Sequence, residues 1–436
     1  MKKTKISAIL LSVVMLSGVF SGCSATEKKV SSVPSSDAAS QAASVPAEDT
    51  AAGGKVTVAV WNEPNSDEAL NMYAQAEKAT GIEVNVTVIP ESDYSSKLNQ
   101  MVSTGDTSTD IYVVWENDIS NFAQVGGILP LDDYLKQSTI KTDDFIDAVY
   151  KLSEGLGGTY GLPWCAATEI LYYNQDMFDA AGIEYPDNNW RYDDFKAAAE
   201  KLTQKADDGT TEVYGTALPN TQTWWAGIGA AGDKVYDPAT GKMEIGTGAV
   251  SFISDFKEMT EKGIAPAPSS DTADLFAAGK AAMSWQGSWN IGTYGDKLDF
   301  NWDIATLPTD QKKYNTLHTG FYTINAKSQN QDSAFKVIEY LMGEEGQEIN
   351  SKASGNPSAI ASLAEKGAWK VESATTVENW DAVTDSLAAG VFGYTCLPSG
   401  VTNNAVSEFN AAVLGQKTPE EAVESASQYA KETIGY

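Results

Sequence analysis

The sequence predicts an α/β fold for the body of this 436-residue chain. Three observations support it. Between residues 56 and 115, short apolar segments alternate with helical ones, which is typical of a parallel sheet covered by helices. After Pro163 a strand is again followed by helices, so a second α/β unit begins there. About 380 residues remain after the N-terminal leader and linker, enough for two or three domains with their own cores.

The elements of the first unit follow from hydrophobic periodicity and helix-end signals. A helix is expected to begin at Asn65, with Glu68 three residues later, and to stop at Gly81. A second helix is expected to end at Gly105. The predicted elements, in order, are a strand at 56–60, the first helix, an alternating strand at 82–88, a helix at 94–104 and a strand at 110–115.

The second unit shows similar signals. The acidic pair Asp193-Asp194 lies where a helix is expected to open. Two segments rich in turn-forming residues, 206–210 and 237–242, are expected to connect strands. The other predicted elements are a strand at 170–173 and helices at 190–202 and 250–262.

The N-terminus reads as an export signal rather than a membrane span. A cationic start precedes an apolar run at 6–20, which is shorter than the roughly 20 residues that a spanning helix needs. Small residues before Cys23 resemble the lipobox of bacterial lipoproteins, so residues 1–22 are expected to be removed and Cys23 to carry a lipid. Ordinary secretion, with Cys23 an incidental thiol, is the alternative. Residues 23–54 are then a lipidated Cys and a flexible tether.

Charge and cysteine content restrict the function classes. The chain has 30 Lys and Arg against 59 Asp and Glu, a net charge of −29, which argues against nucleic acid as a partner and favours a role in solubility. Cys165 and Cys396 are the only other cysteines. A disulfide between them is possible, but two distant thiols make no disulfide framework, so free, partly buried thiols are the default.

Several segments taken together resemble the extracellular solute-binding protein family 1, the maltodextrin-binding group that serves ABC importers. They occur in order at 109–115, 121–135, 158–163, 171–178, 276–283, 287–289, 334–347 and 415–422. The resemblance implies a type II periplasmic-binding-protein-like fold, with two α/β lobes around a ligand cleft and a hinge of three segments. The implied lobes are 55–166 plus 317–365 and 167–316 plus 366–436.

Tryptophans are abundant, and several lie where a strand meets a loop. The chain has 11 of them, and Trp61-Asn62-Glu63 and Trp115-Glu116-Asn117 each follow a predicted strand. A sugar site needs aromatic planes for the C–H faces of the rings and carboxylates or amides for the hydroxyls, and both tripeptides offer both. The alternative is that these aromatics pack the lobe cores, above all Trp190, Trp302 and Trp369.

The candidate ligand-binding residues come from the resemblance and from their location. The resemblance favours Trp115, Trp289, Trp224 and Trp225 as stacking residues, and then Phe392 and Tyr394. Location adds Trp61, Glu63, Glu116 and Glu169. The full set is Trp61, Asn62, Glu63, Trp115, Glu116, Asn117, Trp164, Glu169, Trp224, Trp225, Gln286, Gly287, Ser288, Trp289, Phe321, Tyr322, Phe392 and Tyr394.

Catalytic, metal and cofactor chemistry find little support. Glu116 and Glu169 could imitate a glycosidase pair, although their separation is not set by the sequence. His318 is the single histidine, which largely excludes catalytic triads and histidine metal sites, and a structural role in the hinge is expected for it. No phosphate-binding loop occurs. No cofactor or metal is therefore expected, with structural calcium left open.

The sequence thus predicts a non-enzymatic, monomeric receptor at the outer face of a bacterial membrane, anchored through Cys23. It would bind a carbohydrate, with an oligosaccharide favoured over a monosaccharide, and deliver it to an ABC permease. One alternative keeps the fold but binds a cationic solute, such as a polyamine or a quaternary amine, among Glu63, Glu116 and Glu169. A sugar-acting enzyme and a sensory receptor with a kinase partner are further alternatives.

Overall fold

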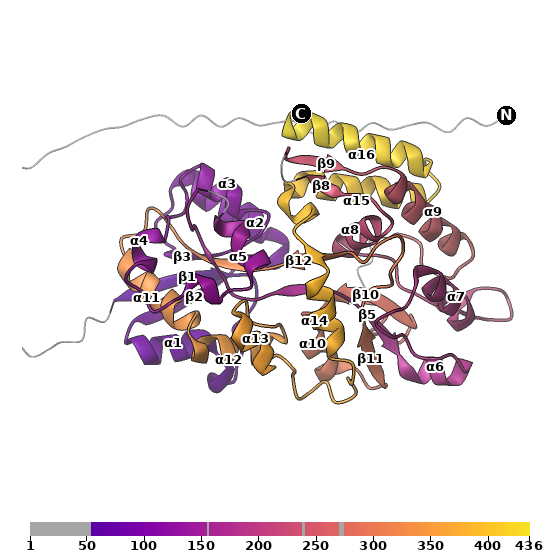
Figure 1. The fold of residues 1–436 in the computed structure, drawn as a ribbon, viewed down its shortest axis with the longest axis horizontal. Helices are drawn as coiled ribbons and strands as arrows, with labels where there is room; N and C mark the ends of the chain where they lie inside the picture. Colours follow the sequence, from indigo (N-terminus) through magenta and orange to yellow (C-terminus); the bar gives the residue numbers. More distant parts are fainter. Residues whose placement is uncertain (1–53, 155–156, 238–239, 270–273) are drawn as a thin grey trace, which may run out of the picture. The chain divides into compact units, whose positions relative to one another are not determined.

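The computed structural model describes residues 54–154, 157–237, 240–269 and 274–436. Figure 1 shows the course of the chain. The predicted signal segment, Cys23 and the tether up to residue 53 lie outside the described residues. Within the described ranges, no helix is long and apolar enough to cross a membrane.

The first sheet has five strands in the order β2-β1-β3-β13-β4. The prediction of a parallel sheet holds for β1, β2 and β3, whereas β13 pairs antiparallel with both β3 and β4, because it enters this sheet directly from the other one. The strands are β1 (Lys55–Val60), β2 (Glu83–Val88), β3 (Ile111–Trp115), β4 (Leu162–Pro163) and β13 (Gly320–Ile324).

The predicted first helix is split in two. A short 3-10 helix, η1 (Glu68–Leu70), comes first, and α1 (Met72–Thr80) begins where the Asn71 side chain accepts from Ala74 N at 3.1 Å. Gly81 ends α1 at φ 69°, as predicted. The remaining helices of this part are α2 (Glu91–Thr104), α3 (Ile119–Gln124), α4 (Asp132–Leu135), η2 (Thr142–Asp144), α5 (Asp147–Glu154), α11 (Gln331–Leu341), α12 (Glu344–Ser354) and α13 (Ala361–Lys366).

The second sheet is built on one long strand, β5 (Ala167–Asn174), all of whose residues are buried. Three strands pair antiparallel with it, and the last of these pairs parallel with β14. They are β10 (Met283–Gly287), β11 (Trp302–Ala305), β12 (Asn315–His318) and β14 (Gly390–Val391).

Helices and two small ribbons complete the second part. Residues 206–210 connect β6 (Gln204–Lys205) with β7 (Thr211–Val213), and β8 (Val235–Asp237) pairs with β9 (Lys242–Glu244), so both predicted turns connect strands. The helices are α6 (Gln175–Ala181), α7 (Tyr192–Leu202), α8 (Thr221–Ala230), α9 (Thr247–Glu261), α10 (Asn290–Lys297), α14 (Asp381–Ala388), η3 (Tyr394–Cys396), α15 (Ser399–Val413) and α16 (Pro419–Ile434).

Three connections join the two sheets and their helices. Residues 164–166 lead from β4 to β5, and Thr319 alone lies between β12 and β13. The third connection runs from α12, which packs on α1, through α13 to α14, which packs on β5. Figure 1 shows β12 in the middle of the molecule, between the two sets of strands. Because so few residues link the sheets, small backbone changes there can alter the cleft described below.

The apolar cores follow the two sheets. Two buried clusters flank the first sheet, around Val58 and Tyr322 on one side and around Tyr94 and Phe122 on the other. A large cluster beside the second sheet contains both Trp224 and Trp225, and a smaller one contains Trp302 and Trp369. Each part therefore buries its own core against its own sheet, as expected of two α/β lobes.

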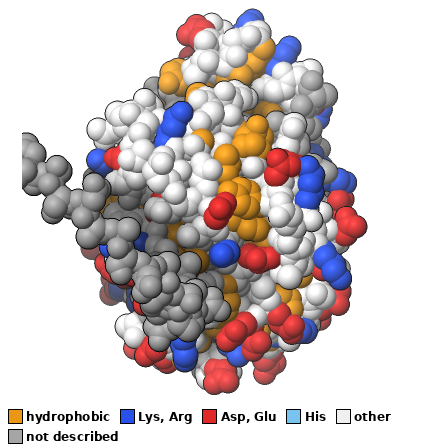
Figure 2. All heavy atoms as spheres, turned by 90° about the vertical axis from the view of Figure 1, so that its left-hand side faces the viewer, with side chains coloured by type: hydrophobic (Ala, Val, Ile, Leu, Met, Phe, Trp, Pro, Cys, Tyr) orange, Lys and Arg blue, Asp and Glu red, His pale blue; other side chains and the backbone are white. Residues whose placement is uncertain are grey.

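Charged side chains are mainly at the surface. Figure 2 shows acidic side chains gathered toward the lower edge of one face, with lysines among them and short apolar strips between. Most of the described Lys–Asp and Lys–Glu pairs are largely exposed; in the Lys136–Asp133 pair the side chains are 70% and 89% exposed. Exposed pairs of this kind contribute about 0–1 kcal/mol each, so the fold depends on its cores rather than on them.

Candidate functional site

A cleft of about 1450 Å³ is lined by residues from both sheets and from the connections between them. The first sheet contributes residues at the carboxyl ends of parallel strands, since Trp61 follows β1 and Trp115 ends β3. The second sheet contributes Trp289, just beyond β10, and the connections contribute Trp164 and Thr319. Crevices at the carboxyl ends of parallel strands are the usual ligand sites of open α/β sheets.

Three tryptophan rings, those of Trp61, Trp115 and Trp164, form one wall of the cleft. The ring centroid of Trp61 lies 5.2 Å from that of Trp115, 5.5 Å from that of Tyr94 and 6.2 Å from that of Trp164. Tyr94 is buried beneath this group, and its hydroxyl lies 2.8 Å from the carbonyl oxygens of Ala59 and Val113. The buried tyrosine thus fixes the ends of β1 and β3, from which the two tryptophans project.

Trp289 faces the cleft from the other sheet because Gly287 leaves room for its ring. A Cβ on Gly287 would lie 2.1 Å from Cζ2 of Trp289, far closer than atoms can approach. The indole packs edge to face on the imidazole of His318, with ring centroids 5.4 Å apart, and Tyr394 lies on the far side of the histidine with centroids 5.9 Å apart. The second aromatic wall is therefore built around His318.

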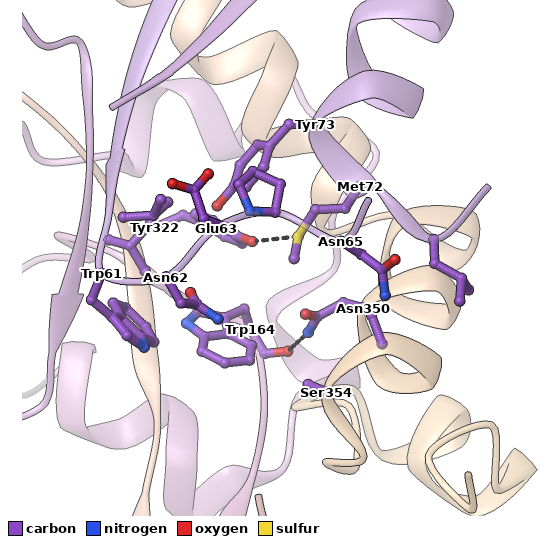
Figure 3. A pocket seen from close by; sticks show the side chains of 15 residues that line it. Trp61, Asn62, Glu63, Asn65, Met72, Tyr73, Trp164, Tyr322, Asn350 and Ser354 are labelled. Atoms are coloured by element: carbon purple, nitrogen blue, oxygen red, sulfur yellow. Dashed lines mark hydrogen bonds between the residues drawn. The ribbon is translucent and has the colours of Figure 1, made fainter. Parts of the chain in front are cut away.

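A smaller pocket of about 200 Å³ opens off the cleft on the side of the first sheet. Trp61 and Trp164 belong to both spaces. Figure 3 shows the side chains of Met72, Trp164 and Asn350 pointing into this pocket. The other lining residues are Val60, Asn62, Glu63, Pro64, Asn65, Leu70, Tyr73, Val113, Tyr322, Ala353 and Ser354.

His318 lies between two carboxylates at the floor of the cleft. Its Nδ1 is 2.8 Å from Oε1 of Glu116, which follows β3, and its Nε2 is 2.6 Å from Oε1 of Glu169, on β5. Thr316 donates its hydroxyl proton to the other oxygen of Glu169. Because the carboxylates belong to different sheets, the histidine links the two sheets beside Thr319, where the chain crosses from one to the other. We refer to Glu116, His318 and Glu169 as the hinge triad.

The geometry requires a protonated imidazole. Both ring nitrogens face carboxylate oxygens, and only the imidazolium can donate to both. Burial by itself lowers the pKa of His318, but the charge of Glu169 and the hydrogen bonds to Glu116 and Glu169 outweigh it and raise that pKa to about 10. The hinge triad therefore holds a protonated imidazole between two glutamates at neutral pH.

This titration predicts a pH dependence of stability. Below pH ~6.5, the ordinary histidine pKa, folded and unfolded chains both hold the proton and the contribution of the triad is fully present. As the pH rises from there through the folded-state pKa of about 10, that contribution is lost. The free energy of unfolding should fall by up to about 1.4 kcal/mol per pH unit over this range. Melting temperatures of the protein and of His318→Gln between pH 6.5 and 9.5 check this, since equal slopes would contradict it.

The structure brings ten of the sequence-predicted residues to these two spaces. The cleft is lined by Trp115, Glu116, Asn117, Trp289 and Tyr394, the side pocket by Glu63 and Tyr322, and both spaces by Trp61, Asn62 and Trp164. They come from separate parts of the chain, and β3, β10 and β13 place them together.

Two predicted stacking residues are placed elsewhere. Trp224 and Trp225 have no exposed surface and pack in the large core of the second lobe, on Phe409 among others. Their helix, α8, is apolar on nearly all sides, and only its first residues, Thr221 and Gln222, reach the cleft. The core-packing alternative thus describes this pair, because two adjacent indoles on a buried helix gain more by packing than by facing water.

Six further predicted residues lie outside the lining of both spaces. Glu169 has no exposed surface and binds His318, while Gln286 accepts from Asn220. Gly287 lacks a side chain and so leaves room for the ring of Trp289. The others are Ser288, which is buried against Asn356, Phe321, which is buried in the core around Tyr94, and Phe392, which packs on the core around Tyr322.

Sequence reasoning missed several polar residues of the cleft. His318 was expected to have a structural role, and its two partners fit that role, but it also lines the cleft. Asn356 and Ser354 come from the end of α12 and the loop after it, which carry no local signal of a site. Positive charge is added to the lining by Lys297, Lys352 and Lys370. Of all these residues, only the lone histidine, which lies between aromatic segments of the sequence, could have been noticed in advance.

The cysteines and acidic residues offer no metal or disulfide chemistry in the part of the chain that the structure describes. Cys165 and Cys396 are both free thiols, in agreement with the default expectation, and burial raises the pKa of each to about 12. Across the described ranges, no group of three or more His, Cys, Asp or Glu side chains could hold a metal ion.

Comparison with known families finds a match over most of the described chain. A family model described as bacterial extracellular solute-binding protein matches residues 60–348, about two thirds of the chain. Among curated proteins, a putative binding protein of Brucella abortus is 27% identical over 277 residues, 60% of this chain and 64% of that protein. The galactooligosaccharide-binding protein of Bacillus subtilis is 22% identical over 398 residues, 86% of this chain and 89% of that protein.

Comparison with solved structures finds the same architecture. An ABC substrate-binding protein of Listeria monocytogenes, solved in complex with cycloalternan, superimposes with a TM-score of 0.78. The two are 24% identical, and the superposition covers 88% of this chain and all of the other. At this level of identity the likeness concerns the fold, which has the same two lobes around a cleft.

Proposed function

The chain belongs to the bacterial extracellular solute-binding proteins, and on that premise we propose that it binds a carbohydrate between its two lobes and delivers it to an ABC importer. We further propose that the carbohydrate is an oligosaccharide. A cleft of about 1450 Å³ exceeds the ~300–1,000 Å³ that drug-sized ligands occupy, so it offers room for several sugar rings. The galactooligosaccharide binding named for the Bacillus subtilis relative supports the same ligand class.

The observation that carries the proposal is the pair of aromatic walls. Trp61, Trp115 and Trp164 line the cleft from the first sheet and its connection, and Trp289 and Tyr394 line it from the second lobe. Flat indole faces bury the C–H surfaces of sugar rings, and the polar groups between them can bind hydroxyls. Asn117, Asn356 and Gln222 supply such groups.

Ligand binding would close the two lobes on each other. A sugar held by Trp115 on one side and Trp289 on the other contacts both lobes only when they are close, so it favours the closed state. The single residue Thr319 and residues 164–166 are the connections that would bend. The lobes are proposed as 55–166 plus 317–365 and 167–316 plus 366–436.

The structure gives reasons to prefer this function over the alternatives. In a cation cage, free carboxylates would have to face the ligand together, yet Glu116 and Glu169 already share the proton-bearing His318, and Glu63 lines only the side pocket. The same pairing argues against a glycosidase, which needs two carboxyl groups flanking an open position for the substrate, whereas Glu169 has no exposed surface. We therefore propose a binding protein rather than an enzyme.

The location follows from the family and from the first residues of the chain. Extracellular solute-binding proteins act outside the cytoplasm. We propose that cleavage before Cys23 and lipidation of its thiol hold a monomeric receptor at the outer face of the membrane. Such an anchor would keep the cleft near a permease.

A thermal-shift screen against a glycan panel tests the proposed ligand class. A saccharide present at 100 times its Kd should stabilise the protein by about 2.7 kcal/mol and raise the melting temperature. The panel should contain neutral mono-, di- and trisaccharides, with spermidine and choline as cationic controls. Stabilisation by a cation and by none of the saccharides would refute the carbohydrate proposal.

A further inference from the structure

The side pocket differs from the cleft in being formed by one lobe. Its residues come from the loop after β1, from α1, β3, β13 and α12, and from Trp164 at the end of β4. All of these pack around the first sheet. A ligand group in this pocket is therefore held by the first lobe alone, whereas a group in the cleft meets both lobes.

The pocket has the chemistry of a site for a single sugar ring. Its apolar part is formed by Val60, Val113 and the rings of Tyr73 and Tyr322, all buried. Its polar part includes Asn350, whose amide donates to the carbonyl oxygen of Trp164 at 3.2 Å and which points into the pocket (Figure 3). An apolar surface beside a few fixed polar groups matches a ring with C–H faces and hydroxyl edges.

Its size and position then select the part of the ligand that fits. The volume of about 200 Å³ lies below the ~300–1,000 Å³ of sites for drug-sized ligands, so the pocket suits a single ring rather than a chain of rings. It is about one-seventh of the volume of the cleft, which it joins at Trp61 and Trp164. A ring that enters here from the cleft leaves no room for the chain to continue beyond it.

We propose that the side pocket binds the terminal unit of a linear saccharide, so that the protein recognises a chain end. This inference rests on the proposed carbohydrate function. The rest of the chain lies along the cleft between the aromatic walls. A cyclic saccharide has no terminal unit, so the pocket adds nothing to its binding affinity.

Filling the pocket provides the test. Met72 lines the pocket but not the cleft, and its sulfur accepts from the Tyr322 hydroxyl at 3.1 Å. Met72→Trp should block the pocket, and because it removes one ring site it should give each linear saccharide the affinity that the wild type shows for a chain one unit shorter. Loss of one well-packed ring corresponds to about a tenfold weaker Kd.

Leu414→Trp is the control for an added indole, because Leu414 is 45% exposed and lines neither the cleft nor the pocket. Isothermal titration with mono-, di- and trisaccharides of one linear series, and with a cyclic saccharide, measures the effect, and melting curves verify that both variants fold. In the control variant, the Kd for each saccharide length should equal that of the wild type. An unchanged length dependence in Met72→Trp, or equal losses for linear and cyclic saccharides, would overturn the terminal-unit site alone. Absence of saccharide binding by the wild type would overturn the proposed function and this inference with it.

Discussion

Replacement of His318 with leucine is expected to destabilise the protein by about 3–5 kcal/mol, because it leaves two buried carboxylates without their shared cation. Glu169 has no exposed surface and Glu116 is only 9% exposed, so water replaces the imidazolium poorly at Glu116 and not at all at Glu169. The two carboxylates also belong to different sheets, so their repulsion acts across the hinge. Urea unfolding monitored by tryptophan fluorescence measures the change in the free energy of unfolding.

Two comparisons separate this effect from a general loss of charge pairs. Lys136→Gln removes a pair at the surface and should leave the free energy of unfolding nearly unchanged. The triple variant with glutamine at positions 116, 169 and 318 removes all three charges and should regain much of the lost stability. A His318→Leu protein within 1 kcal/mol of the wild type would show that the hinge triad contributes little.

The double substitution Trp115→Ala/Trp289→Ala is expected to weaken saccharide binding by more than about 100-fold, the largest effect on function that we expect. One tryptophan lies on each side of the cleft, and both are partly exposed to it. Each single substitution should cost about 30-fold, since a buried aromatic anchor is worth about 2 kcal/mol. Isothermal titration with the saccharide that stabilises the wild type most measures these changes.

Trp380→Ala is the control for the loss of an indole. Trp380 is half-buried, packs on Trp369 with ring centroids 5.5 Å apart and does not line the cleft. Its removal should lower the melting temperature without changing saccharide affinity. Unchanged affinity in the double cleft variant would remove the aromatic walls from the proposed site.

Local patterns along the chain correctly indicated the elements and the fold class. The strands at β1, β2 and β3 and the helix ends at Gly81 and Gly105 lie where alternation and glycine predicted them. The exact start of α1 was wrong by several residues, because Asn65 and Asn71 are both suitable capping residues and only the folded chain selects Asn71. The antiparallel β13 was not predicted, because the strand follows a crossing that leaves no local signal.

The sequence by itself determined the α/β class, the resemblance to solute-binding proteins and the aromatic character of the site, because these depend on periodicity and residue type. The tertiary structure decided which aromatics face the cleft. Trp224 and Trp289 are equally suitable by type, but one lies on a buried helix and the other beside a glycine at a strand end. It also decided the charge at the hinge. Glu116, Glu169 and His318 are up to 202 residues apart, and only the packing of β3, β5 and β12 brings them within hydrogen-bond distance.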